Sequence, residues 1–202
     1  MLPLFKSDFS IGKSILTLEL PERTQEGSSD SIFSIALAND LDQLILVEDS
    51  LTGFLQAHKN SESLGLKLIF GLRISICSDL KSDPKDTEKK DESKIIVFAK
   101  NDDGCKLLNQ IYSLAFTEGM SRIDYKNLKK FWSDSLLLSI PFYDSFIFNN
   151  AMAFNNCIPD FSFTSPVFFI EDNLLPFDKF IQEKIKNYCS KKKYKKEETK
   201  SI

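Results

Sequence analysis

Short runs of apolar residues alternate with amphipathic stretches along most of the chain. Runs that are apolar at nearly every position are typical of buried strands, and apolar stripes that recur every three to four residues are typical of helices. The pattern predicts strands at residues 2–5, 44–47, 66–77 with a break at Gly71, 94–99, 136–140 and 167–170. It predicts helices at residues 31–39, 53–60, 102–118, 124–132 and 177–188.

Strands that alternate with helices, and that are apolar on both faces, favour an α/β fold built on a mainly parallel sheet or barrel. Enzymes with such folds place their chemistry at the carboxyl ends of the strands. Two predicted strand ends carry acidic pairs, Glu48 with Asp49 and Glu171 with Asp172, which could hold Mg²⁺ or Mn²⁺ through oxygen ligands. Acids at strand ends more often cap the following helix or face water, so these pairs alone do not define a site.

Two charged segments interrupt this pattern. Residues 79–94 are rich in acids and lysines and are expected to form a solvated loop. Residues 190–202 hold six lysines and are expected to form a lysine-rich tail or linker, which leaves one folded domain at residues 1–189. The tail could touch nucleic acid, but Tyr194 is its only aromatic residue, so a solvated tail is the simpler interpretation.

Composition excludes several classes of protein. The single histidine, His58, is predicted on a helix surface, so mechanisms that need several imidazoles are excluded. The four cysteines lie far apart in sequence, which argues against a zinc knuckle or a redox dithiol and predicts buried free thiols. Glycine-rich phosphate loops and the serine-hydrolase elbow are absent from the sequence. No apolar run is long enough to span a bilayer, and Lys6 and Asp8 come too early for a signal peptide, so a cytoplasmic protein without a membrane partner is expected.

Six short segments follow one another in the order of a known family. They are residues 4–10 (LFKSDFS), 44–54 (LILVEDSLTGF), 65–73 (GLKLIFGLR), 94–104 (KIIVFAKNDDG), 116–119 (FTEG) and 168–171 (FFIE). In this order and spacing, the chain resembles the PHP (polymerase and histidinol phosphatase) domain at the N-terminus of the alpha subunit of bacterial or phage-type DNA polymerase III. The resemblance covers nearly the whole chain and implies a distorted barrel of mainly parallel strands ringed by helices.

Active members of this family bind a cluster of metal ions through histidines and carboxylates, and the metals activate water for phosphoester hydrolysis. By resemblance, the vestigial positions of that site in this chain are Leu4, Lys6, Asp8, Glu48, Asp49, Arg73 and Lys94. The three cations among them would repel a metal cluster. We therefore expect no metal, no cofactor and no catalytic residue, and an ion-pair network between these cations and the three acids. An alternative is that the cations form a pocket for phosphate or nucleic acid.

The resemblance implies a non-catalytic PHP-like domain of a replicative DNA polymerase III alpha subunit. Such a domain would support the polymerase module and, as in some members, dock a proofreading exonuclease. Its partners would be the rest of the alpha subunit, in cis or in trans, with DNA reached only through the whole polymerase. Two alternatives stay open, namely a metal-dependent phosphoesterase with a carboxylate-based site around Asp8, Asp49 and Glu171, and a stand-alone interaction module.

Overall fold

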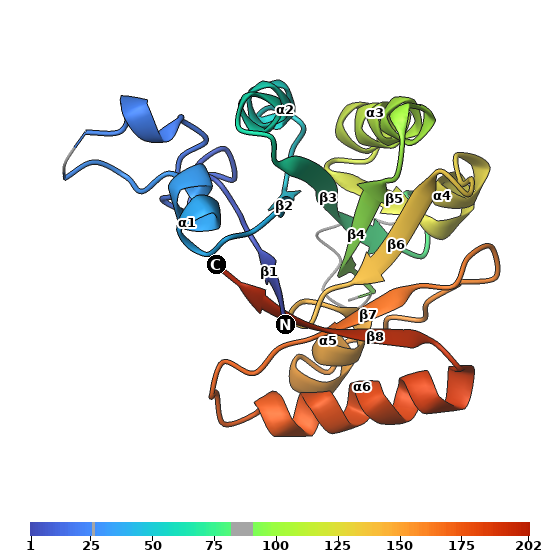
Figure 1. Ribbon diagram of the computed structural model, residues 1–202. Coiled ribbons are helices and arrows are strands. Elements are labelled where there is room, and N and C mark those ends of the chain that lie inside the picture. Colours follow the sequence, from blue (N-terminus) through green and yellow to red (C-terminus); the bar gives the residue numbers. More distant parts are fainter. Residues whose placement is uncertain (26, 82–90) are drawn as a thin grey trace. The chain divides into compact units, whose positions relative to one another are not determined.

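A computed structural model describes residues 1–25, 27–81 and 91–202 of the chain (Figure 1). These residues form a mixed α/β fold whose strands pair mainly in parallel, as the alternation of apolar runs predicts. Close approaches between Cα atoms group the chain into two units. The N-terminal unit comprises Pro3–Leu72 with Ser201–Ile202, and the C-terminal unit comprises Arg73–Lys200 with Met1–Leu2. The segment predicted as a single domain, residues 1–189, is therefore shared between the two units.

The N-terminal unit is built on two parallel strands, β2 (Gln43–Glu48) and the first part of β3 (Lys67–Cys77). The other elements of this part of the chain are the short strand β1 (Leu2–Leu4), the 3-10 helix η1 (Pro21–Arg23), α1 (Ile32–Ala38) and α2 (Phe54–Ser63). Its core is made of apolar side chains with no exposed surface, among them Leu18, Ile32, Phe33, Leu44, Leu46 and Leu72. The apolar runs identified in the sequence therefore supply this core.

The C-terminal unit holds the rest of β3 in a sheet of order β8-β7-β6-β4-β3, with β5 paired to β3. Its further strands are β4 (Ser93–Ala99), β5 (Arg122–Asp124), β6 (Leu136–Ile140), β7 (Val167–Ile170) and β8 (Lys195–Ser201). Its helices are α3 (Asp102–Thr117), α4 (Tyr125–Lys130), α5 (Phe146–Met152) and α6 (Asp178–Lys192). Strands β4 and β6 pair antiparallel, whereas β3 with β5, β6 with β7 and β7 with β8 are parallel pairs.

Polar side chains fix where several helices begin. In α1, α3, α4 and α5, a backbone N–H of the first turn donates to the side chain of the residue before the helix. These accepting residues are Ser31, Asn101, Asp124 and Ser145. In α3, a Cβ added at Gly104 would lie 2.3 Å from the backbone oxygen of Ser135, so the helix packs there too closely for any side chain. Among the helices of the described residues, none combines the length and the apolar character needed to cross a membrane.

Most predicted elements are confirmed, with two corrections. Gly71 does not break β3, because the ladder to β2 continues through it with Val47 opposite. The tail predicted at residues 190–202 is wrong, because α6 continues to Lys192 and β8 begins at Lys195. Of the loop predicted at 79–94, residues 82–90 lie outside the described residues, and residues 93 and 94 begin β4. Sequence analysis missed η1, β5 and α5, which are short.

An aromatic cluster explains why the lysine-rich segment adopts regular structure. Phe168 on β7 has no exposed surface, and the ring of Tyr194 stacks on it with centroids 5.8 Å apart. The ring of Phe168 is also in contact with the rings of Phe146, Phe161 and Tyr188. Each such aromatic pair contributes about 0.5–1.5 kcal/mol beyond the burial of its area. Tyr194 therefore anchors the chain directly after α6, and β8 then pairs with β7.

Replacing Tyr194 by alanine should release the C-terminal strand. Losing the contacts with Phe168 and Tyr188 removes about 1.4 kcal/mol of local stability, which raises the open population about tenfold. Trypsin cleavage after Lys195 and Lys196, followed by mass spectrometry, should accelerate by a similar factor because cleavage follows the open population. Tyr194→Phe keeps the ring and serves as the control. Equal cleavage of the wild-type and Tyr194→Ala chains would show that the aromatic cluster does not hold β8.

Candidate functional site

The positions marked by the family resemblance fall into two polar clusters, one in each unit. The N-terminal cluster surrounds the carboxyl end of β2 and includes Leu4, Lys6, Asp8, Glu48 and Asp49. The C-terminal cluster includes Arg73 on β3 and Lys94 on β4. The chemistry open to each cluster depends on the hydrogen-bond and ion-pair partners that surround these residues within their own unit.

Glu48 is the most buried charged residue of the N-terminal cluster, with no exposed surface. Its carboxylate accepts the backbone N–H of Ser7 at 2.7 Å and the hydroxyl of Ser10. The Ser10 oxygen in turn accepts the backbone N–H of Asp49 at 3.0 Å. Burial raises the pKa of Glu48, while the hydrogen bonds from Ser10 and Ser7 act in the opposite direction. This carboxylate therefore ties the end of β2 to the turn at residues 7–10.

Lys6 and Asp49 form the ion pair of the N-terminal cluster. Nζ of Lys6 lies 3.4 Å from Oδ2 of Asp49, and their side chains are 20% and 30% exposed. Asp8 is exposed, and its backbone N–H donates to the carbonyl of Leu16. Leu4 is buried, so a residue at this position contributes to the core. The Lys6–Asp49 pair is one contact of the predicted ion-pair network. Glu48 instead accepts hydrogen bonds from the backbone N–H of Ser7 and the hydroxyl of Ser10.

The two cations of the C-terminal cluster share one loop residue, Asp144, that follows β6. The guanidinium of Arg73 is paired with the Asp144 carboxylate, and the Arg73 side chain is only 14% exposed. The backbone N–H of Lys94 donates to the Asp144 carbonyl at 2.7 Å. Nζ of Lys94 donates to the hydroxyl of Ser75 at 2.7 Å. Asp144 has a φ of 58°, a left-handed conformation that Asp tolerates better than most residues.

A second polar network of the C-terminal unit begins next to Asp144. The Tyr143 hydroxyl donates to Oδ1 of Asp178 at 2.9 Å and accepts the amide of Asn173 at 3.0 Å. The same Asn173 amide donates to Oε2 of Glu171, the acid that follows β7, at 3.1 Å. Burial raises the pKa of Tyr143 to about 12. Its hydroxyl therefore stays protonated near neutral pH and acts as a hydrogen-bond donor rather than as a base.

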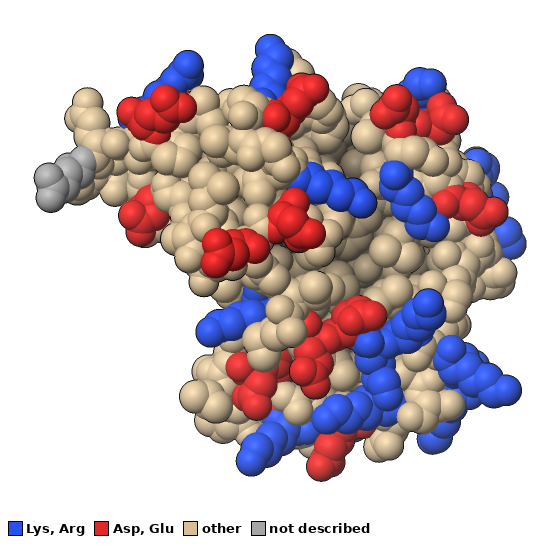
Figure 2. All heavy atoms as spheres, in the orientation of Figure 1, with Lys and Arg blue, Asp and Glu red and all other residues tan. Residues whose placement is uncertain are grey.

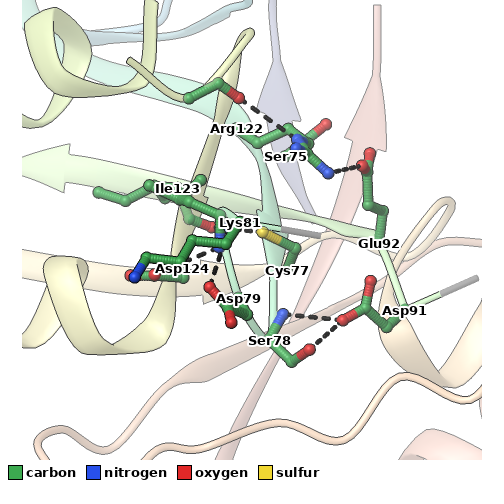
Figure 3. A network of polar contacts seen from close by, with 12 residues as sticks. Ser75, Cys77, Ser78, Asp79, Lys81, Asp91, Glu92, Arg122, Ile123 and Asp124 are labelled. Atoms are coloured by element: carbon green, nitrogen blue, oxygen red, sulfur yellow. Dashed lines mark hydrogen bonds and ion pairs between the residues drawn. The ribbon is translucent and has the colours of Figure 1, made fainter. Parts of the chain in front are cut away.

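A third network lies where the parallel strands β3 and β5 end (Figure 3). Arg122 is only 3% exposed, and Figure 3 shows its guanidinium directed at Glu92, with Nη1 2.8 Å from Oε1. Asp124 accepts the N–H of Asn127 and so begins α4. Burial raises the pKa of the nearby Cys77 thiol to about 12, which keeps it protonated and inert. These contacts hold strand and helix ends together.

The family's metal cluster does not fit these residues. Lys6 and Arg73, which the resemblance places at ligand positions, are each paired with a carboxylate, Asp49 and Asp144 respectively. Within the part of the chain that the structure describes, no group of three or more His, Cys, Asp and Glu side chains is arranged to hold a metal ion. Of the acids proposed for a carboxylate-based site, Asp8 and Asp49 belong to the N-terminal unit and Glu171 to the C-terminal unit.

Sequence reasoning missed the partners of the named residues. Ser7 and Ser10 were present in the family-like segment at residues 4–10, and their spacing around a turn was the available signal. Asp144 gave no such signal, because its role depends on a loop conformation after β6. Tyr143 and Asn173 meet only because β6 and β7 run in parallel and end at the same edge of the sheet.

Comparisons with known proteins add no family. A scan against protein-family models finds no match to this chain. A search of curated proteins also finds no match.

Replacing Glu48 by glutamine should make the pH dependence of stability diverge from that of the wild-type chain. Glu48 has a raised pKa in the folded state, so ionising it weakens that state. The contribution of Glu48 to the free energy of unfolding is thus fully present when the pH is below about 4.5, the ordinary pKa of this group. It falls as the pH rises through the raised pKa of the folded state. The glutamine variant lacks this loss and should gain stability relative to the wild-type chain over that window.

Urea denaturation at a series of pH values measures this difference. Glu22→Gln, at an exposed position of η1, controls for the loss of one negative charge. A difference between the Glu48→Gln and wild-type chains that stays constant with pH would contradict the assignment of a raised pKa to Glu48.

Proposed function

We propose that the chain is a non-catalytic PHP-type domain that belongs to a replicative DNA polymerase III alpha subunit, in cis or in trans. One observation carries the proposal. At the positions where the family has metal ligands, this chain has cations held in contacts with their own unit, Lys6 with Asp49 and Arg73 with Asp144. The order of the six family-like segments along the chain suggests the PHP family. The two ion pairs suggest that the metal-dependent activity of that family has been lost in this chain.

The electrostatics of the two clusters support a structural rather than a catalytic role. A divalent metal at Asp49 or Asp144 would have to displace a lysine or an arginine already within contact distance of the carboxylate. Glu48 is fully buried and its oxygens accept hydrogen bonds from Ser7 and Ser10, which leaves it poorly placed for a metal. The cations therefore do in each unit what metals do in active members, in that they join chain segments through a central charge.

The partners follow from the same proposal. A PHP-type domain without chemistry of its own contributes a folded surface to the polymerase module, and in some members that surface docks a proofreading exonuclease. For this chain the proposed partner is accordingly the remainder of an alpha subunit. The exonuclease would be a further partner in trans.

Metal analysis tests the loss of catalysis, and the source gene tests the polymerase assignment. The purified chain should contain zinc and manganese far below one ion per chain, and its background hydrolysis of bis(p-nitrophenyl) phosphate with manganese should be unchanged by Asp49→Asn. Stoichiometric metal, or hydrolysis lost in Asp49→Asn, would instead support a phosphoesterase. A reading frame that continues past Ile202 into a polymerase with an acidic palm, or a polymerase that co-purifies with the native chain, would support the assignment. A stop codon at that point, with a native mass of 23.1 kDa and no polymerase attached, would overturn it.

A double-mutant cycle tests whether Arg73 and Asp144 act as a structural pair. Arg73→Met, Asp144→Asn and the double variant should give a coupling free energy of about 0.5–2 kcal/mol in urea denaturation, because the guanidinium is largely buried. Lys106 and Asp103 form a matched pair on the exposed face of α3 and should couple more weakly. Asparagine at 144 keeps the left-handed backbone accessible, so strain does not confound the cycle. Equal coupling in the two pairs would contradict a structural role for the Arg73 pair.

A further inference from the structure

The charge of the chain is distributed very unevenly. The last 25 residues hold nine lysines and four acids, while the preceding 177 residues hold 17 basic and 25 acidic residues. A chain with a net charge of −3 thus ends in a segment with a charge of +5. Such asymmetry is typical of chains that bind a polyanion through one segment.

All nine lysines of this segment are exposed on α6, on β8 and on the turn between them. We call them the α6–β8 lysine surface; they are Lys179, Lys184, Lys186, Lys191, Lys192, Lys193, Lys195, Lys196 and Lys200. In Figure 2 the lower part of the molecule, where Figure 1 places α6 and β8, shows many Lys and Arg side chains with Asp and Glu side chains among them. Of the four acids, Asp178 is buried and bonded to Tyr143, which leaves three glutamates beside nine exposed lysines.

Three exposed glutamates, Glu183, Glu197 and Glu198, offset only part of the positive charge of this surface. The ion pairs found among the described residues involve none of the nine lysines. One of the nine, Lys184, lies over the exposed ring of Phe180, 4.6 Å from its centroid. Lysines in the last turn of a helix stabilise its negative end, which accounts for Lys191 and Lys192 but not for the lysines on β8.

The lysines are densest at a turn that is held in place. Lys193 ends α6 in a left-handed conformation, with φ of 59°, and Tyr194 follows immediately with its ring stacked on Phe168. Lys195 and Lys196 then enter β8, paired with β7. Binding to these side chains therefore costs no ordering of a tail, which is the entropic loss that weakens binding by disordered basic segments.

We infer that the α6–β8 lysine surface binds the sugar–phosphate backbone of nucleic acid without sequence preference. Lysine is a point charge suited to phosphate, and residues 178–202 hold no arginine, whose planar fork could read a base edge. A membrane surface fits less well, because it needs several apolar side chains beside the lysines, and Phe180 is the one exposed large apolar residue of α6. Exposed Leu174 and Leu175 precede α6, whose 15 residues span about 22 Å from there to the dense lysine turn.

This inference does not rest on the proposed polymerase function, since it uses only α6 and β8. It departs from the expectation that DNA reaches the chain only through a whole polymerase. RNA and DNA present the same phosphate chemistry, so both should bind with similar affinity.

Fluorescence anisotropy of labelled oligo-dT with the full chain tests the inference. Binding should weaken steeply with salt, because neutralising phosphates releases counterions. Lys191→Ala/Lys192→Ala/Lys196→Ala should weaken binding about tenfold or more at low salt and reduce the slope of log K against log salt by about two, at roughly 0.7 per lysine on single strands. Lys126→Ala/Lys129→Ala/Lys130→Ala removes three exposed lysines from α4, two of them in its last turn, and should leave binding within about twofold.

Each remaining outcome overturns the inference. The surface is not a nucleic-acid site if oligo-dT does not bind at low salt, or if the two triple variants weaken binding equally. Binding to phosphatidylserine vesicles in place of oligo-dT, lost in the α6–β8 variant, would identify a membrane surface instead. If the alanine variant does not fold by circular dichroism, Lys191→Gln/Lys192→Gln/Lys196→Gln replaces it, since glutamine keeps helix propensity and removes the charge.

Discussion

Phe168 lies on β7 with no exposed surface, and rings from α5, from α6 and from the residue before β8 pack around it. Fully burying such a side chain contributes about 1.5–3 kcal/mol, and its aromatic pairs add to this. The lysines that follow α6 repel one another, which favours an extended and solvated chain. The stacking of Tyr194 on Phe168 opposes that repulsion. The C-terminal elements and the density of positive charge on them therefore depend on one buried ring.

Buried charges in each unit are met by partners close at hand. Glu48 is surrounded by the amide and hydroxyl groups of Ser7 and Ser10, and Arg122 is neutralised by Glu92. Removing charged groups from water is costly, so such networks add little net stability compared with apolar residues of similar size. Their value is in specifying geometry, because each buried charge is tolerated only where its partners meet it. In this chain they fix how strand ends connect to the loops that follow them.

The regular elements follow from local sequence, whereas the contacts between them do not. The apolar stripe of α3 and the cap at Asp124 could be recognised because the residues that define them are neighbours in sequence. Strand β8 was missed because its sequence is almost wholly polar and it forms only by pairing with β7. In the candidate site, the positions of Lys6 and Arg73 could be named in advance, but the partner of Arg73 could not. Asp144 reaches it across 71 residues of sequence through a left-handed turn.

The free thiols and the single imidazole happen to divide between the units. All the cysteines lie in the C-terminal unit, at positions 77, 105, 157 and 189, and burial raises the pKa of each thiol. His58 lies on α2 in the N-terminal unit, with its imidazole on the surface. Cys105 is half-buried, so the alkylation rates of the buried Cys77, Cys157 and Cys189 report the opening of one unit, and a lone imidazole proton resonance reports on the other. The wild-type chain thus carries a separate spectroscopic or chemical reporter for each unit, and whether the two unfold together can be measured without introducing a label.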